Sequence, residues 1–418
     1  MRLALLALGT RGDALPMIAL GIGLRDSGHD ISVVTHPSYA ILAENFGLPV
    51  TRVRADVEVM LAGRDANFLR DADASNAELF IRFHRLISTR YGEMGAECLE
   101  ASHGVDGVIG NPVSTIIALT IAEKLDVPAI TSFWGPVYPS RCAPVGGLPH
   151  APAWLGPVHA QFYWSSCLTV AAAQWFSLRG SVNKWRKSIG LRPLGLHGPL
   201  DRFLASTSLQ AYSGTLVNRH PDWPDHVHIT GHWLTPPLRG WSPPDDLARF
   251  LASGAPPVAV ALGSMHRGTR KAEAIVAALR RCKLRGVFTG MGADPGTQAG
   301  DDMFYARDVP HDWLFRRASA VIHHAGAGTT PRVVLAGLPS VPLPLMNDEP
   351  FWAATLRSHG VATEAMTLRT LSVDRLAEAI DAAATDCCMR RRAQELGSRL
   401  ATEDGVGRAV GLIEKAIA

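Results

Sequence analysis

The chain has 418 residues, of which 47% are hydrophobic and 19% are charged, an ordinary globular composition. This length favours two domains over one. The formal net charge of +3 is too small to indicate a nucleic-acid partner, and the six cysteines show neither a CxxC motif nor a disulfide framework. We therefore expect reduced thiols in a cytoplasmic protein.

No stretch is expected to form a transmembrane helix, because the most apolar one, 167–178, is short and interrupted by Gln174. The N-terminal residues 1–8 are apolar, but a signal peptide would need a longer core and a cleavage site. We therefore interpret them as a buried strand of a soluble protein. Peripheral contact of an apolar surface with a membrane stays open.

In chain order, the first half alternates apolar runs with helical patterns. A helix is expected over 15–26, and strands are expected over 3–8, 31–35, 107–110, 129–132 and 214–217. Because these runs are continuously apolar rather than alternating, the strands should be buried on both faces, as in a parallel sheet covered by helices. The strand–helix–strand order predicts an open α/β fold that binds ligands at the carboxyl ends of its strands.

A proline-rich stretch at 235–244 interrupts this pattern and indicates a linker, taken as 235–246. After it, an apolar run followed by Gly263 and Ser264 repeats the opening run followed by Gly9 and Thr10, which indicates two similar domains. Further strands are expected at 286–289, 319–323 and 340–345, and helices at 271–282, 331–336, 350–358, 373–384 and 387–401. The predicted domains are 1–234 and 247–400, with a C-terminal helix within 401–418 that packs back toward the first domain.

The most informative motif begins at Val321, where an apolar run ends in His323 and His324, a small-residue loop and a helix start. Thr330 is a suitable N-cap, and Pro331 suits the first helical position. A strand, a glycine–alanine loop and a helix N-terminus present backbone N–H groups to an anion, most often a phosphate. The spacing matches neither a GxGxxG nor a Walker motif. Adjacent strand residues point to opposite faces, so the two histidines are not expected to share a metal, and His324 is interpreted as a packed, hydrogen-bonded core residue.

Four motifs follow one another along the chain: GTRGDALPMIALGIGLRDSGHDISVVT (9–35), GSM (263–265), VPHDWLF…VIHHAGAGTT…AGLPSVPLPLMNDEPFWA (309–353) and LATEDGVGRAVGLIE (400–414). Together they resemble the family 1 glycosyltransferases of GT-B fold, above all the bacterial branch that glycosylates natural products. The resemblance implies two facing Rossmann-like, doubly wound parallel-sheet domains with a cleft between them. The N-terminal domain would bind the acceptor and the C-terminal domain the nucleotide sugar.

The resemblance also implies the chemistry. In this family an acceptor hydroxyl attacks the anomeric carbon of the nucleotide sugar and the diphosphate leaves with inversion, through an oxocarbenium-like transition state. A base near the hydroxyl and stabilisation of the departing charge are required. Asp13 matches the position of the base, where plant relatives carry His before x-x-Pro. Its other interpretation is the N-cap of the first helix, since Pro16 falls in the first turn.

For the donor, the resemblance points to the diphosphate-binding loop and to His323, with no metal and no cofactor. The donor-binding residues it implies are Thr10, Arg11, Gly263, Ser264, Val309, His323, Gly326, Ala327, Gly328, Thr329, Asp348 and Glu349. Val309 would read the nucleobase edge through its backbone, and Asp348 and Glu349 would contact the sugar hydroxyls.

Three residues depart from the family pattern. Ala325 stands where most relatives have Gly, which predicts a φ below zero at that position. Pro331 replaces a ribose-binding Glu of the plant relatives, so the loop does not indicate UDP over dTDP. Glu349 replaces Gln, exchanging an amide for a pure acceptor and leaving the sugar open.

The acceptor side is expected to be apolar and aromatic, with Trp134 and Tyr138 as acceptor-binding residues. The leading interpretation is an inverting, metal-independent glycosyltransferase that moves a hexose or deoxyhexose from a UDP- or dTDP-sugar to a lipophilic natural product, as a monomer or homodimer. A sterol or glycolipid glycosyltransferase is the nearest alternative, supported by the apolar stretch 152–178. A degenerate, non-catalytic GT-B partner protein is the other, supported by the three departures. A nucleotide-sugar epimerase and a Rossmann dehydrogenase fit the motifs less well.

Overall fold

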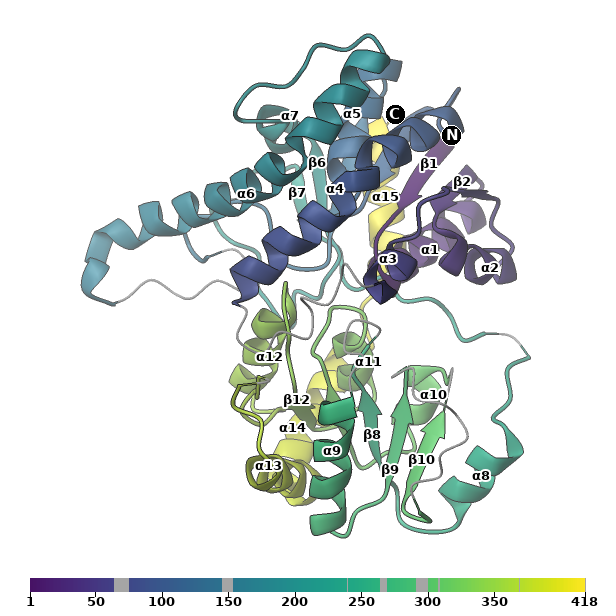
Figure 1. Ribbon diagram of the computed structural model, residues 1–418, viewed down its shortest axis with the longest axis vertical. Coiled ribbons are helices and arrows are strands. Elements are labelled where there is room, and N and C mark those ends of the chain that lie inside the picture. Colours follow the sequence, from purple (N-terminus) through teal and green to yellow (C-terminus); the bar gives the residue numbers. More distant parts are fainter. Residues whose placement is uncertain are drawn as a thin grey trace. The chain divides into compact units, whose positions relative to one another are not determined.

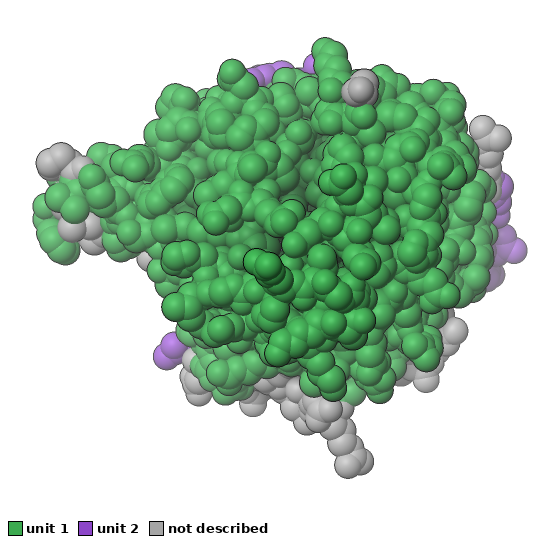
Figure 2. Space-filling view, turned by 90° about the horizontal axis from the view of Figure 1, so that it is seen from above, with its two compact units in different colours: residues 1–68, 75–236, 404–418 green, residues 69–74, 237–403 purple. Residues whose placement is uncertain are grey.

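The computed structural model describes residues 1–63, 75–144, 153–238, 240–263, 269–290, 300–306, 309–367 and 369–417. These residues divide into two compact units, shown in different colours in Figure 2. Unit 1 contains the chain up to Pro236 together with the C-terminal segment from Asp404, and unit 2 contains Pro237–Glu403. Among the described residues, no helix is both long enough and apolar enough to cross a membrane.

Unit 1 is built on a parallel sheet with the strand order β3-β2-β1-β4-β5-β6-β7 in the described part of the chain (Figure 1). Its strands are β1 (Arg2–Ala7), β2 (Asp30–Thr35), β3 (Val50–Arg52), β4 (Gly107–Gly110), β5 (Ala129–Phe133), β6 (Thr207–Gln210) and β7 (Val227–Ile229). Strand order reverses between β1 and β4, and ligands of open α/β sheets bind at the carboxyl ends of the strands beside such a reversal.

The helices of unit 1 are α1 (Arg11–Asp26), α2 (Pro37–Asn45), α3 (Val57–Ala62), α4 (Asn76–Ala101), α5 (Thr115–Leu125), η2 (Ala153–Val158), α6 (His159–Ser188), α7 (Leu200–Ala205) and α15 (Gly405–Ile417). Helix α15 packs on α1, where Gly23 leaves room for Val406. His29 Nε2 lies 2.9 Å from Glu414 Oε1 and ties α15 to the start of β2. The C-terminal segment is therefore part of unit 1.

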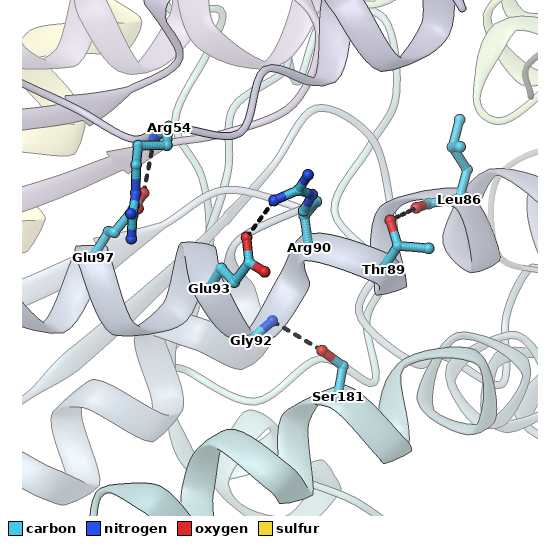
Figure 3. A network of polar contacts seen from close by, with 8 residues as sticks. All are labelled: Arg54, Leu86, Thr89, Arg90, Gly92, Glu93, Glu97 and Ser181. Atoms are coloured by element: carbon cyan, nitrogen blue, oxygen red, sulfur yellow. Dashed lines mark hydrogen bonds and ion pairs between the residues drawn. The ribbon is translucent and has the colours of Figure 1, made fainter. Parts of the chain in front are cut away.

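Helices α4 and α6 pack closely along one another, and small residues allow the approach. The backbone N–H of Gly92 donates to Ser181 Oγ across the pair at 2.9 Å (Figure 3). A side chain at Gly95 would lie 2.7 Å from the ring of Trp185, so glycine is needed there. Another face of α4 carries the Arg90–Glu93 ion pair, 2.8 Å between its charged atoms.

Unit 2 is built on a second parallel sheet, with the order β10-β9-β8-β11-β12 in its described residues. The strands are β8 (Val258–Ala261), β9 (Gly286–Thr289), β10 (Met303–Ala306), β11 (Ala320–His323) and β12 (Ser340–Pro342). The helices are α8 (Asp245–Ala252), α9 (Thr269–Arg281), α10 (His311–Phe315), α11 (Thr330–Leu335), α12 (Glu349–Ser358), α13 (Val373–Thr385) and α14 (Cys387–Leu400).

Alternate residues of each central strand enter two different cores. Val258 and Val260 belong to one core, whereas Ala259 and Ala261 belong to the other, on the opposite face of the sheet. The prediction of continuously apolar strands buried on both faces, in an α/β fold with parallel sheets, is confirmed.

Several predicted elements are wrong in detail. The segment 214–217 is a turn, because the hydroxyl and carbonyl of Ser213 accept the N–H groups of Thr215 and Leu216 and so compete with strand pairing. Strands β6 and β7 were not predicted, since their short sequences mix polar and apolar residues. The strand predicted at 340–345 ends at Pro342. The first helix begins at Arg11 rather than at residue 15.

Candidate active site

The turn after β1 can be made only by glycine. Gly9 has a φ of +114°, and a Cβ at this position would lie 2.5 Å from Asp13 Oδ2. The backbone N–H of Gly9 donates to His36 Nε2 at 2.9 Å, which leaves the His36 proton on Nδ1, where it donates to Ala55 O at 2.7 Å. Burial lowers the pKa of His36, so this neutral tautomer is maintained.

Asp13 projects from the first turn of α1 and is half-buried. Its Oδ2 accepts the backbone N–H and the hydroxyl of Thr10, both at 2.9 Å, and its Oδ1 accepts Trp134 Nε1–H at 3.1 Å. Burial raises the pKa of Asp13, and these hydrogen bonds oppose that rise. The carboxylate is thus held in one orientation by neutral donors.

The interpretation of Asp13 as an N-cap is wrong. Thr10 is the N-cap of α1, and Asp13 is the third helical residue, reaching back to the N–H of Thr10 as in a capping box. The sequence-based helix began too late, because Pro16 lies inside the helix rather than at its start. Arg11, the first helical residue, is exposed.

Asn111, directly after β4, was not predicted as a site residue. Its Nδ2 donates to Leu8 O at 2.6 Å and to Asp13 O at 3.4 Å, which joins the ends of β4 and β1. Its Oδ1 accepts the N–H of Ser114 at 3.0 Å. The only sequence signal is a buried strand ending in an amide residue.

Trp134 and Tyr138 have different surroundings. Trp134 follows β5, is 8% exposed, donates to Asp13 and packs edge-to-face on Trp233 with ring centroids 5.6 Å apart. Tyr138 is buried in an aromatic cluster with Phe203 and Trp223. Its hydroxyl donates to Leu204 O at 2.9 Å. The structure therefore brings Trp134 to Asp13, whereas Tyr138 contributes to packing.

In unit 2, His323 ends β11 and is fully buried. Its Nδ1 accepts the N–H of Ala325 at 3.2 Å, so Nε2 carries the proton. Within the described residues, Nε2 has no hydrogen-bond partner. Burial, with a smaller contribution from the charge of His324, lowers the pKa of His323 to about 3. This side chain is a neutral donor with an unused N–H.

The prediction of a negative φ for Ala325 is wrong, since its φ is +62°. The chain turns here through the left-handed region that glycine adopts most easily, at a cost of about 1 kcal/mol for alanine. Ala325 is fully buried, and its N–H is taken by His323. The loop therefore keeps the turn despite losing the glycine.

Some N–H groups of the small-residue loop form hydrogen bonds within the loop. The N–H groups of Thr329 and Thr330 both donate to Gly326 O at 3.0 Å. Thr329, not Thr330 as predicted, is the N-cap of α11, because this inner turn starts one residue earlier. No hydrogen bond within the described residues uses the N–H of Ala327 or Gly328, and these two amides are available to an anion.

Gly263 and Gly326 enclose the ring of His324. A Cβ at Gly263 (φ +75°) would lie 3.0 Å from this ring, and one at Gly326 would lie 2.3 Å from its Nε2. His324 Nδ1 hydrogen bonds to Ala261 O at 3.2 Å, as predicted, but the side chain is half-buried rather than part of the core. Ser264, which the sequence assigned to the same site, lies outside the described residues.

Glu349 is the first residue of α12 and is 2% exposed. Its Oε2 accepts the N–H groups of Leu345 and of Met346, the latter at 3.2 Å. Burial raises the pKa of Glu349, while the charge of His324 and these hydrogen bonds oppose the rise. Asp348 occupies the N-cap position without a capping side-chain bond. Glu349 therefore shapes the turn that carries Asp348.

Two further residues complete the description of unit 2. Val309 is buried in the core with Leu314 and Phe315. Lys271, in the first turn of α9, is buried, and sequence reasoning missed it. In the described part of the chain, one grouping has metal-ligand spacing: Asp386, Cys387 and Cys388, all exposed at the start of α14.

Comparison with known proteins identifies the chain. Residues 3–144 match the glycosyltransferase family 28 N-terminal domain, and residues 243–404 match the UDP-glucoronosyl and UDP-glucosyl transferase family. The chain is 32% identical to an O-mycaminosyltylonolide 6-deoxyallosyltransferase of Streptomyces fradiae, over 99% of this chain and 97% of that protein. It is 29% identical to a sterol 3-beta-glucosyltransferase of Arabidopsis thaliana, over 98% of this chain and 64% of the plant protein.

Solved structures show the same fold. The glycosyltransferase of kitacinnamycin has a TM-score of 0.68 at 19% identity, covering 99% of this chain and 98% of that one. The glycosyltransferase VinC, solved in complex with dTDP, has a TM-score of 0.66 at 18% identity, covering 100% and 99%. The α/β architecture with two parallel sheets is thus that of the GT-B enzymes, and the chain belongs to the family 1 glycosyltransferases of GT-B fold.

Proposed function

We propose that this glycosyltransferase moves a hexose or deoxyhexose, with inversion, from a UDP- or dTDP-sugar to a hydroxyl of a lipophilic small molecule, with Asp13 as general base. The observation that carries the proposal is the Asp13 carboxylate at the strand-order reversal of unit 1. It is half-buried, oriented by Thr10 and Trp134, and its pKa is raised by burial. A raised pKa makes a carboxylate a better proton acceptor near neutral pH.

The donor is proposed to bind unit 2 through its diphosphate. His323 supports this role, because its Nε2–H is directed by the Nδ1 bond and is unused among the described residues. The amides of Ala327 and Gly328 would add two donors, whereas the N–H of Thr329 is already engaged. Gly263 and Ser264 after β8, and Thr10 and Arg11 after β1, stay in the proposal as diphosphate contacts.

The remaining donor contacts are proposed with one addition. Asp348 would contact the sugar, and the backbone of Val309 would contact the base. Glu349 would contact the sugar as expected, and its Oε2 would also hold the turn that carries Asp348 by accepting the N–H groups of Leu345 and Met346.

The acceptor class is supported by the relatives. An O-mycaminosyltylonolide 6-deoxyallosyltransferase and several sterol glucosyltransferases resemble the chain along nearly its whole length. We place the natural product first because that relative has the higher identity, 32%, and is matched over 97% of its own length. A sterol acceptor is the second candidate, consistent with the exposed apolar side chains of Trp154 and Phe162. The structure of VinC with dTDP supports dTDP beside UDP.

The first test is thermal unfolding in the presence of UDP, dTDP and GDP, followed by product analysis with matching hexose conjugates and a panel of macrolide and sterol acceptors. A ligand at about a hundred times its Kd adds about 2.7 kcal/mol of stability, which raises the Tm measurably. We expect one or two of the nucleotides to raise the Tm and the matching sugar to give a glycoside. No Tm shift and no glycoside would favour the degenerate partner protein.

We propose that side chains and backbone amides, rather than a metal ion, stabilise the negative charge that develops on the departing diphosphate. We therefore expect equal initial rates after dialysis against EDTA and after addition of Mg²⁺ or Mn²⁺. Loss of activity with EDTA, restored by either ion, would overturn this part of the proposal.

A further inference from the structure

Three charged or titratable side chains come together at one edge of the unit 2 sheet. Lys271 lies in the first turn of α9, which follows β8, His324 follows β11, and Glu349 begins α12, which follows β12. Strands β8, β11 and β12 are neighbours and parallel, so their carboxyl ends lie at the same edge. The donor loop, residues 323–329, follows β11 and therefore lies at this edge too.

Lys271 is unusually placed for a lysine, since only 7% of its surface is exposed. Lysine is almost never this buried unless its charge is compensated. The pKa of Lys271 is lowered to about 8 by burial, and the carboxylate of Glu349 opposes that change. Burial raises the pKa of Glu349, and the charges of His324 and Lys271 oppose that rise. The three groups therefore form one electrostatic cluster.

The hydrogen bonds that Glu349 Oε2 accepts do not require a negative charge on the side chain. Its Oε2 accepts two backbone N–H groups, which the oxygen of a glutamine amide could accept equally well. The negative charge of Glu349 instead acts on Lys271, where it opposes the lowering of the lysine pKa by burial.

Two other side chains of the donor loop (residues 323–329) and of the helix after it are less suited to supply a positive charge to the diphosphate. His323 is held neutral by burial, and Arg332 on α11 is paired with Asp312 at 2.6 Å. When the bond from the anomeric carbon to the phosphate oxygen breaks, its electron pair stays on the diphosphate, which gains one negative charge. A buried ammonium group close to that charge stabilises the transition state more than a solvated one does.

We propose that the Lys271 ammonium binds the diphosphate of the nucleotide sugar and stabilises it as it leaves, and that Glu349 keeps this ammonium charged before the donor arrives. This inference rests on the proposed function. In the complete step, the acceptor hydroxyl oxygen bonds to the anomeric carbon and its proton passes to Asp13. The carbon–oxygen bond to the diphosphate breaks, and the added charge is met by Lys271.

The test compares Lys271→Met, Glu349→Gln and the double variant with the parent chain, with Lys283→Met as control because Lys283 is an exposed lysine just after the same helix. Calorimetry measures the Kd of UDP and dTDP beside that of UMP and dTMP, and each variant's Tm is recorded. We expect Lys271→Met to weaken diphosphate binding about tenfold or more while monophosphate binding changes little, since one desolvated charge pair is lost. Lys271→Arg should recover part of the loss, and the control should match the parent.

The double variant separates a binding role from a purely structural one. Glu349→Gln alone removes the charge that opposes the cost of burying the Lys271 ammonium and should lower the Tm, and removing both charges should restore it. We expect the double variant to regain the Tm yet still bind UDP and dTDP weakly. If it regains both, or if Lys271→Met binds the diphosphates as the parent does, Lys271 has no role toward the donor. A parent chain that binds no nucleoside diphosphate would instead contradict the proposed function.

Discussion

Replacing Trp134 by Phe removes one hydrogen bond to the proposed base and little else. Trp134 Nε1–H donates to Asp13 Oδ1 at 3.1 Å, and the ring packs edge-to-face on Trp233. Phenylalanine keeps an aromatic ring in that contact but has no donor. The substitution therefore tests whether Trp134 acts on Asp13 through this bond.

The expected loss of activity in Trp134→Phe can be worked out from the strength of a hydrogen bond to the charged Asp13 carboxylate. A hydrogen bond to a charged group contributes about 1.5 kcal/mol or more, and about 1.4 kcal/mol is a factor of ten in an equilibrium. The bond favours the carboxylate form, so losing it raises the pKa of Asp13 further. Because the base acts when ionised, we expect kcat/KM to fall about tenfold on the acid side of the pH profile and to change little on the alkaline plateau.

The assay is kcat/KM against pH for the parent, Trp134→Phe and Trp233→Phe. Trp233 is the matched control, since it is equally buried but donates to Thr230 Oγ1 at 3.0 Å instead of to Asp13. The acid limb should move to higher pH in Trp134→Phe alone. If the acid limb does not move in Trp134→Phe, or moves equally in both variants, the Trp134 bond does not set the pKa of Asp13.

Two further predictions concern Gly9 and the buried histidines. Gly9→Ala should displace the Asp13 carboxylate, the proposed base, and lower kcat about a hundredfold. Gly28→Ala, with a φ of +87° but open space around it, should lower only the Tm. Equal activity losses in the two variants would contradict this prediction. Burial lowers the pKa of His84 to about 4 and of His323 to about 3 in the folded protein. Below the ordinary histidine pKa of about 6.5, these two side chains therefore bind protons in the unfolded chain but not in the folded one. Each histidine should lower the free energy of unfolding by about 2 kcal/mol as the pH falls from about 6.5 to 5. Urea unfolding at both pH values should show this loss, reduced in His84→Gln; an identical loss in that variant would refute the assignment.

The parts of the fold with strong local signals could be predicted from the sequence. Continuous apolar runs identified β1 and β8, and the glycines that follow them marked the loops at the carboxyl edges. Strands β6 and β7 were not predicted because their pairing depends on neighbours in the sheet rather than on an apolar run. The turn at 214–217 was wrongly predicted as a strand because the Ser213 side chain competes with strand formation.

At the site, residue types could be predicted but not their pairings. The sequence singled out Asp13 and His323, yet it placed Asp13 at the wrong helical position and did not predict the hydrogen bond from Trp134 to Asp13. The Trp134–Asp13 bond joins residues from two separate elements, and no periodicity encodes it. The same holds for Lys271 and Glu349, whose compensation depends on burial at a shared strand edge. Alanine normally prefers a negative φ, but at Ala325 the turn of the loop and the hydrogen bond from its N–H to His323 Nδ1 outweigh this preference.

The central claim is that Asp13 accepts the proton of the attacking hydroxyl. Asp13→Asn alone is an imperfect probe, since one oxygen already accepts two donors from Thr10 and the amide NH₂ would then face Trp134 Nε1–H. The double variant Asp13→Asn, Trp134→Phe removes that conflict. The most direct measurement is glycoside formation by this double variant against Trp134→Phe on the alkaline plateau, with Tm and nucleoside diphosphate affinity recorded for both. We expect equal Tm and affinity, with turnover of the double variant lowered by about a hundredfold or more. Comparable turnover in the two proteins would contradict it.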